Sequence, residues 1–339
     1  MRYKCTVSYI GKNYCGWQSQ RNGDSIQEQI EHALYRLTGQ KVNILASGRT
    51  DKGVNASGQV FHFDTDKVMR PRKWQGAINA FLPDDIHICS VEEAGPHFHA
   101  RYCVRKKTYA YRIHFGEADV FSREYAYQCP YAVDVGKMKD AAKYLVGKHD
   151  FAALCSNSFK ETPDQVRTIY DISFEKERDM LTIRFTGDGF LRYQVRMMSA
   201  LLLEIGQGRR KAEDIPVILA SRSKRLARKN AHPEGLTLEK VEYFRILAES
   251  ESTVVKEVTE EYPKIYEKYG GCDREQYVIA DRHLPIVFGM VTVNNEEAEI
   301  DLFSSEYREK TDTVFEELAG VFEGRKIRLK YGSNIVKMD

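Results

Sequence analysis

The 339-residue sequence predicts an α+β protein with more than one domain. Its length is more than twice the roughly 150 residues of an ordinary domain. Segments with the two-residue period of strands are mixed with helical segments, and neighbouring strands can pair antiparallel, which disfavours a doubly wound parallel sheet. Two halves of similar layout divide near residue 105, which suggests an internal duplication, although no sequence repeat demonstrates it.

The first elements follow from periodicity and helix-end residues. Residues 2–9 alternate, with Tyr3, Cys5 and Val7 on one face of a predicted strand. Ser25 and Glu28 have the spacing of a capping box, and the helix that they open should end at Gly39. Further strands are predicted at 42–46, 59–63, 86–92, 102–115, 165–174, 180–185 and 236–244, and further helices at 71–81, 135–146 and 191–205.

Charge is divided unevenly along the chain, although the net charge is only +2. Residues 1–245 hold 39 Lys and Arg against 29 Asp and Glu, whereas residues 246–339 hold 12 against 20. The basic part indicates a polyanionic partner, and the acidic part is interpreted as a separate appendage. In the appendage we predict helices at 249–269 and 305–322 and strands at 276–281, 286–293, 298–303 and 326–331, enough for a small α+β domain.

Several classes of protein are disfavoured by composition. Hydrophobic residues at 42% and charged residues at 29% are typical of globular proteins. No apolar run is long enough to span a bilayer, and Met1–Ile10 lacks the apolar block of a signal peptide, so we expect a cytoplasmic protein without membrane contact. The seven cysteines contain no C-x-x-C pair, and no phosphate-binding or dinucleotide-binding glycine motif is present. No metal, ATP, NAD or other cofactor is therefore expected.

One loop carries a candidate catalytic carboxylate. Asp51 lies between Gly48 and Gly53, in a loop that joins two predicted strands. Thr-Asp-Lys-Gly is by itself an ordinary turn sequence. A carboxylate on a loop fixed by two strands, with Arg49 close by, also suits nucleophilic or base catalysis. Spacing alone leaves both interpretations open.

Aromatic and basic residues are interleaved between Arg101 and Arg112. Tyr109 and Tyr111 share a strand face, so core packing is expected for at least one of them. A tyrosine beside basic residues can also stack on an unstacked base while the cations hold phosphates. A second basic run, residues 222–229, has five cations and no acid. It is either a solvated face or a polyanion site.

Two arginines occupy the start of the predicted helix 191–205. Arg192 and Arg196 are four residues apart and should share a helix face. A structural salt bridge is the ordinary explanation. The alternative is that an arginine enters a cleft and pairs with a catalytic carboxylate, since guanidinium stays charged and binds carboxylate through two parallel bonds.

These segments together resemble the bacterial tRNA pseudouridine synthase A family. Residues 48–60 closely match the family signature G-R-T-D-x-G-V-H-A-x-G-Q-V, and the other matches cover residues 1 to about 245 in the family's order. So many ordered matches make the resemblance highly specific. The other matching segments are Tyr14–Gln18, Ser25–Gln27, Phe98–Arg101, Lys107–Tyr111, His149–Phe151, Val166–Ile169, Gly189–Leu191, Gln194–Met197 and Pro233–Leu238.

The resemblance implies a fold and four site residues. The fold would be the pseudouridine synthase fold, α+β, in which two mixed halves, residues 1–105 and 106–245, form a central cleft from antiparallel sheets. Residues 246–339 would follow as the acidic appendage of unknown role. Asp51 would be the catalytic aspartate, and Arg196 would pair with it. Arg49 would help to displace the target nucleotide, and Tyr109 would stack on the flipped uracil.

The implied reaction is isomerisation of uridine to pseudouridine, without a cofactor. By resemblance the substrate is tRNA, at uridines on the 3′ side of the anticodon stem-loop, bound by a homodimer. Two alternatives are the same chemistry on ribosomal RNA and a non-catalytic RNA-binding protein. The sequence departs from the family in three places: Asn55 replaces the usual His, Gly187–Phe190 replaces a typical Asn-Ala-Phe, and the appendage is additional. The first two leave substrate preference open, and the appendage suggests a further partner.

Overall fold

The computed structural model describes residues 1–20, 23–95, 98–160 and 162–243, and beyond them the backbone of six strands. The chain forms two compact units, of which the first comprises Met1–Glu93 and Val104–Glu242 and the second Ala94–Cys103 and Tyr243–Asp339. Both predicted halves contribute to the first unit, and the division between them at residue 105 stays a prediction. No helix in the described part of the chain is both long and apolar enough to cross a membrane.

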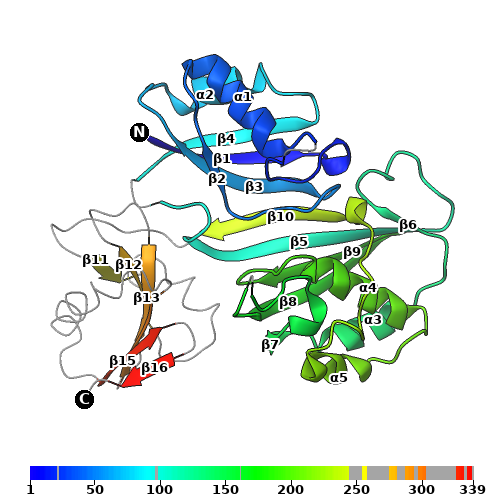
Figure 1. Cartoon of the computed structure of the whole chain (residues 1–339). Helices are drawn as coiled ribbons and strands as arrows, with labels where there is room; N and C mark the ends of the chain where they lie inside the picture. Colours follow the sequence, from blue (N-terminus) through cyan, green and yellow to red (C-terminus); the bar gives the residue numbers. More distant parts are fainter. Residues whose placement is uncertain are drawn as a thin grey trace. The chain divides into compact units, whose positions relative to one another are not determined.

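A ten-stranded mixed sheet runs through the first unit (Figure 1). Its order is β4-β1-β3-β10-β5-β9-β8-β7, with β2 paired to β3 and β6 paired to β5. Antiparallel pairing joins β1 to β3, β5 to β9 and β8 to β9, whereas β10 pairs parallel with β3. The strands are β1 (Arg2–Tyr9), β2 (Ile44–Ala46), β3 (Asn55–Asp64), β4 (Ile86–Ala94), β5 (Val104–Phe115), β6 (Tyr127–Cys129), β7 (Gly147–Asp150), β8 (Val166–Glu177), β9 (Met180–Gly187) and β10 (Leu236–Tyr243).

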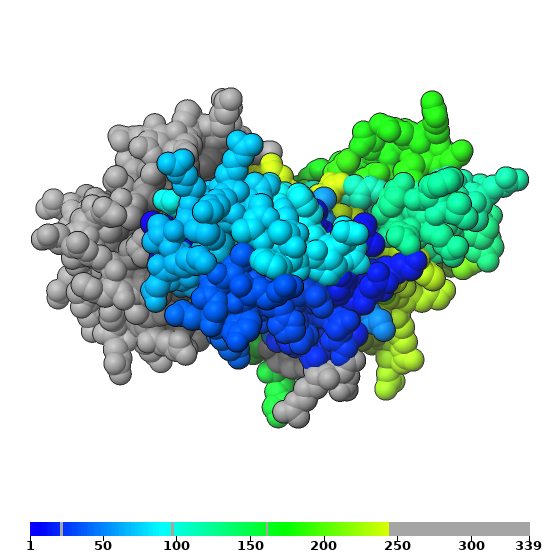
Figure 2. All heavy atoms as spheres, turned by 90° about the horizontal axis from the view of Figure 1, so that it is seen from above, coloured from blue at the N-terminus to red at the C-terminus, as the bar shows by residue number. Residues whose placement is uncertain are grey.

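Helices cover the two ends of this sheet (Figure 1). The view from above shows the segments that carry α1 and α2 on the face nearest the reader (Figure 2). The Ser25 side chain accepts a hydrogen bond from the Glu28 amide and begins α1, and Gly39, in the left-handed region, ends it as predicted. The helices are α1 (Ile26–Thr38), α2 (Pro71–Asn79), α3 (Val135–Ala142), α4 (Gln194–Gly206) and α5 (Asp214–Ser221), with short 3₁₀ turns η1 (Gly11–Asn13), η2 (Ala152–Leu154) and η3 (Pro233–Gly235).

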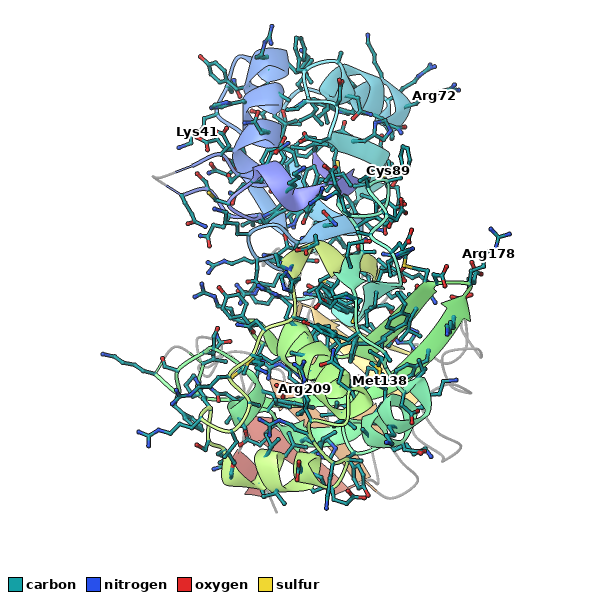
Figure 3. All side chains as sticks on the ribbon, turned by 90° about the vertical axis from the view of Figure 1, so that its right-hand side faces the viewer. Lys41, Arg72, Cys89, Met138, Arg178 and Arg209 are labelled. Carbon is teal, nitrogen blue, oxygen red and sulfur yellow. The ribbon has the colours of Figure 1, made fainter. Side chains whose placement is uncertain are left out.

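The core of the first unit has an aromatic cluster at one end. The rings of Tyr3 and Phe63 stack with centroids 5.4 Å apart, and Trp74 of α2 packs edge-on against Phe63 at 5.4 Å. At the other end, α4 is buried nearly all round and packs on α3, where Met138 is buried (Figure 3). These two clusters fix the helices against the strands that carry the candidate site.

Two predicted boundaries near the candidate site are wrong. Strand β3 begins at Asn55, four residues earlier than predicted, so the loop that carries Asp51 is short. Helix α4 begins at Gln194 rather than Leu191 because Tyr193 has a left-handed backbone (φ 66°). Arg192 therefore precedes the helix, and the helix-face argument that paired it with Arg196 does not hold. The short elements β6, β7 and α5 were not predicted.

The second unit contains a six-stranded sheet in the order β11-β12-β13-β14-β15-β16. Strands β12–β15 confirm the four strands predicted in the appendage. The predicted helix 249–269 is wrong at residues 254–257, which form β11, and the predicted helix 305–322 lies outside the described residues. The strands are β11 (Val254–Glu257), β12 (Glu275–Ala280), β13 (Val287–Val293), β14 (Glu297–Leu302), β15 (Lys326–Tyr331) and β16 (Asn334–Lys337).

A chain that ends at residue 244 should fold. The hydrophobic core cluster of the described residues lies entirely before residue 243. Tyr243, which donates a hydrogen bond to the Ala100 carbonyl and packs on Phe98, would be kept. We expect a cooperative thermal transition and the circular dichroism of a mixed α/β protein. A truncated chain without a cooperative transition would show that residues 245–339 belong to the folding core.

Candidate active site

The loop that carries Asp51 is held on both sides by hydrogen bonds. Ser47 donates its amide to the Val60 carbonyl at 2.8 Å, and Gln59 donates its side-chain amide to the Gly48 carbonyl at 2.9 Å. Lys107 of β5 donates to the Ser47 carbonyl at 2.7 Å. Residues of β3 and β5 thus place the loop. Sequence reasoning missed this bracing, although Gln59 and Lys107 both lie in segments that carry the family resemblance.

Asp51 and Arg196, which the family resemblance pairs, lie near each other in the structure. Nη1 of Arg196 is 3.8 Å from Oδ2 of Asp51, and the two side chains are 14% and 23% exposed. Nε of Arg196 donates to the Ala231 carbonyl at 2.8 Å, and the Ala231 amide donates back to the Arg196 carbonyl at 3.0 Å. This reciprocal pair fixes the guanidinium, so it faces the carboxylate without a tight bidentate bond.

Burial dominates the acidity of Asp51. It raises the pKa of the Asp51 carboxyl above its usual value, while the positive charges of Arg196 and Arg192 oppose this rise. A partly desolvated carboxylate is a stronger base or nucleophile than one in water, and the nearby cation keeps it ionised. The site therefore has the electrostatics of a reactive group.

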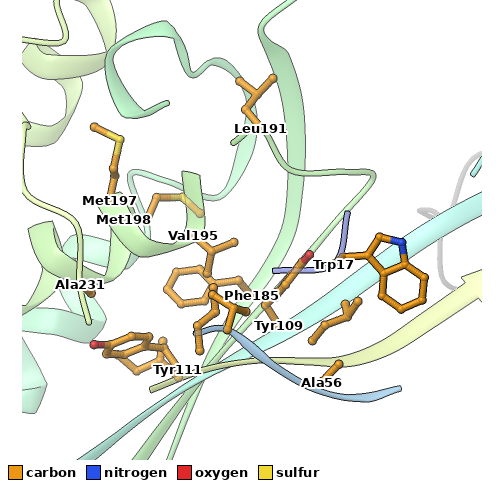
Figure 4. Close-up of a cluster of buried hydrophobic side chains, with 14 of the residues drawn as sticks. Trp17, Ala56, Tyr109, Tyr111, Phe185, Leu191, Val195, Met197, Met198 and Ala231 are labelled. Atoms are coloured by element: carbon orange, nitrogen blue, oxygen red, sulfur yellow. The ribbon is translucent and has the colours of Figure 1, made fainter. Parts of the chain in front are cut away.

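Tyr109 lies close enough to Asp51 for the carboxylate charge to act on its hydroxyl. It is 8% exposed, its ring packs edge-on against Phe190 with centroids 5.2 Å apart, and it lies with Phe185 and Val195 in the cluster of Figure 4. Burial raises the pKa of the Tyr109 hydroxyl, and nearby Tyr9 and Asp51 raise it further, so the hydroxyl stays neutral. The neighbouring Tyr111 is fully buried and belongs to the core.

Arg49 and Arg192 differ in their surroundings. Arg49 is exposed, and it forms no hydrogen bond or ion pair with any residue in the described ranges. The guanidinium groups of Arg192 and Arg196 both lie 5.1 Å from the centre of the Tyr193 ring. The left-handed backbone of Tyr193 thus brings the two cations to one aromatic ring.

A cavity of about 620 Å³ adjoins Arg196. Four of its eight lining residues are cationic and two are acidic. Two of these residues form an ion pair: Nζ of Lys12 lies 2.5 Å from Oε1 of Glu124. The lining residues are Lys12, Lys52, Gly53, Arg123, Glu124, Arg196, Pro233 and Glu234.

Two of the five cations in the basic run at 222–229 are paired with acids of the fold itself. Arg222 pairs with Asp150 at 2.5 Å, and Lys229 pairs with Glu204 at 2.6 Å. Lys224 donates to the Asn157 carbonyl. The argument that this run needs a polyanion is therefore wrong for Arg222 and Lys229, whereas the bond of Lys224 to a neutral carbonyl leaves its charge uncompensated. Arg225 and Arg228 are exposed, and neither forms an ion pair within the described ranges.

The side chains that commonly bind metals are dispersed in the part of the chain that the structure describes. No three His, Cys, Asp or Glu side chains gather there as a metal site requires, and the six cysteines in the described ranges are free. The candidate site combines a carboxylate on a braced loop with a fixed guanidinium beside a cationic cavity. This arrangement defines an enzyme site suited to an anionic substrate.

Comparison with known proteins gives the family. The sequence model of the tRNA pseudouridine synthase family matches residues 6–103 and 141–244. The tRNA pseudouridine synthase A 1 of Bacillus cereus is 45% identical over 71% of this chain and 98% of its own length, and the tRNA pseudouridine synthase A of Anoxybacillus flavithermus is 44% identical over the same shares. That of a Geobacillus species is 42% identical. The chain belongs to the tRNA pseudouridine synthase family, and it is a pseudouridine synthase.

Proposed function

We propose that this enzyme isomerises uridine to pseudouridine in tRNA, at the 3′ side of the anticodon stem-loop. The observation that carries the proposal is the partly buried Asp51 carboxylate, held 3.8 Å from Arg196 in a chain of this family. The names of the relatives given above support tRNA as the substrate.

The chemistry requires one carboxylate and no cofactor. The bond between C1′ and N1 breaks, the uracil turns, and a bond forms between C1′ and C5. The C5 proton leaves and N1 gains a proton, so the product is an isomer of the substrate. Asp51 acts either by attacking C1′ or by removing the C2′ proton. Arg196 keeps the carboxylate ionised and oriented.

The target base has to leave its stack before it can react. Flipping costs a few kcal/mol. We propose that Arg49, exposed on the loop beside Asp51, takes the place of the displaced nucleotide. Tyr109, whose ring is set by Phe190, would stack on the flipped uracil and hold it during rotation.

The cavity supports the proposed cleft between two halves. Lys12 and Lys52 come from residues 1–105, and Arg123 and Glu234 come from residues 106–245. We propose that each subunit of a homodimer offers such a cleft to RNA. The acidic residues 246–339 would affect target choice or bind another partner, so a chain ending at residue 244 should still form pseudouridine. Ribosomal RNA is the alternative substrate, favoured only by Asn55 and the appendage.

The proposal is tested by incubating the purified chain with tRNA anticodon stem-loops that contain a single candidate uridine. Chemical mapping should show pseudouridine at that uridine, and none when the uridine is replaced by cytidine. Conversion of an rRNA fragment but of no anticodon stem-loop would support the alternative. RNA binding without conversion of either substrate would support a non-catalytic RNA-binding protein.

RNA binding should weaken with salt, because bound phosphates release counterions. Lys52→Gln should reduce the slope of log affinity against log salt by about 0.7 to 0.9, the contribution of one phosphate contact. Arg178→Gln is the matched control, because Arg178 projects from the β8–β9 turn (Figure 3) and does not line the cavity. Equal salt slopes for Lys52→Gln and wild type would show that Lys52 does not contact an RNA phosphate.

A further inference from the structure

Asn55 occupies the position of the usual family His, and its side chain is 3% exposed. Its Oδ1 accepts a hydrogen bond from the Gly11 amide at 2.7 Å. Its Nδ2 donates to the Glu124 carbonyl at 2.9 Å and to the Glu234 carbonyl at 3.1 Å. A side-chain amide offers two donor hydrogens and an acceptor oxygen. Asn55 uses both donors and the acceptor.

The three partners of Asn55 belong to three walls of the cationic cavity. Gly11 begins η1, which carries Lys12. Glu124 itself lines the cavity beside Arg123, and Glu234 lines it beside Pro233. These segments are far apart in sequence, and Asn55 joins all three from one position at the start of β3.

Close packing at Gly11 makes this junction rigid. A Cβ added at Gly11 would lie 2.1 Å from the Val54 carbonyl oxygen, far inside contact distance. Only glycine therefore lets η1 approach β3 closely enough for the Gly11 amide to reach Asn55. The place of Lys12 in the cavity wall depends on the same approach.

We propose that Asn55 is a positioning residue that sets the spacing of Lys12 and Arg123 for a phosphodiester group of the RNA. The inference deepens the proposed function and rests on it. Lys12 pairs with Glu124 and Arg196 faces Asp51, so Lys52 and Arg123 are left against the single acid Glu234, and the cavity stays suited to an anion. A neutral histidine has one donor and one acceptor, so it cannot make all three bonds that Asn55 makes.

The test compares Asn55→Asp with wild type on an anticodon stem-loop. The aspartate still accepts from Gly11 but presents a carboxylate to two carbonyl oxygens, which leaves both without a donor. We expect KM and the Kd for RNA to rise about tenfold, with kcat at saturating RNA within about threefold. Gly11→Ala should reproduce this pattern, because it displaces η1, and with it the amide that Asn55 accepts from, while the Asn55 side chain itself is unchanged.

Asn79→Asp is the matched control, since Asn79 also joins two chain segments, by accepting from the Ile88 amide and donating to its carbonyl. It should lower thermal stability and leave KM and Kd unchanged. If Asn55→Asp does not fold, Asn55→His, which keeps two of the three bonds, should raise KM by about threefold. Wild-type KM and Kd in the folded Asn55 and Gly11 variants would overturn the proposal. A wild-type chain that binds RNA without forming pseudouridine would instead overturn the proposed function, and Kd would still test Asn55.

Discussion

Asp51→Asn should abolish pseudouridine formation and leave RNA binding nearly intact. The asparagine keeps the size of the side chain but can neither attack C1′ nor remove a proton. A lost nucleophile or base lowers the rate by about 10⁴-fold or more. Removing a negative charge beside an RNA-binding surface also relieves repulsion, so Kd should stay within about tenfold of wild type. The measurement is a single-turnover assay with saturating enzyme, together with filter binding.

Asp64→Asn is the control for this experiment. Asp64 also pairs with an arginine, Arg2, at 2.8 Å, but it lies at the far end of β3 from the Asp51 loop. Asp64→Asn should lower thermal stability and leave the rate of pseudouridine formation and the Kd for RNA unchanged. If Asp51→Asn forms pseudouridine at more than a small fraction of the wild-type rate, Asp51 is not the catalytic group.

Arg196→Met should reduce the rate and move its pH dependence. Loss of a charged group fixed beside the reacting atoms lowers kcat by about 10²-fold. Burial already raises the pKa of Asp51, and Arg196 opposes that rise, so removing Arg196 raises the pKa further. Because the reaction needs the ionised carboxylate, activity is lost as the pH falls through this pKa. The acid limb of kcat/KM should therefore lie at higher pH in the variant than in wild type.

Arg192→Met provides a graded control for that profile. Arg192 lies at the same distance from the Tyr193 ring but is exposed, and it lowers the pKa of Asp51 less than Arg196 does. Its acid limb should move in the same direction by a smaller amount. If the acid limb of kcat/KM lies at the same pH in Arg196→Met and in wild type, Arg196 does not keep the Asp51 carboxylate ionised.

The fold could be predicted from sequence where local pattern and local structure agree. Alternation in residues 2–9 and the Ser25 cap predicted β1 and α1 correctly. The start of α4 was missed because the left-handed backbone of Tyr193 has no periodic signature. Strand β10 was predicted, but its parallel place beside β3 depends on long-range pairing that sequence pattern does not encode.

The candidate site shows the same limit. The signature around Asp51 indicated the carboxylate, and the family resemblance indicated Arg196. The cavity was not predictable, because Lys12, Lys52, Arg123 and Glu234 meet only in the folded chain. The pairing of Arg222 and Lys229 was also hidden, since the acids that pair with them, Asp150 and Glu204, lie in other elements.

A transcriptome-wide pseudouridine map, made in cells with and without this gene, tests the central claim most directly. Stem-loop RNA is recognised by shape through phosphate and 2′-OH contacts spread over a surface, so the map identifies the substrate that no short motif records. Re-expression of wild type and of Asp51→Asn separates catalysis from binding. The sites lost on deletion should lie in the anticodon arms of several tRNAs and return only with wild type. Loss confined to ribosomal RNA, or restoration by Asp51→Asn, would contradict the account.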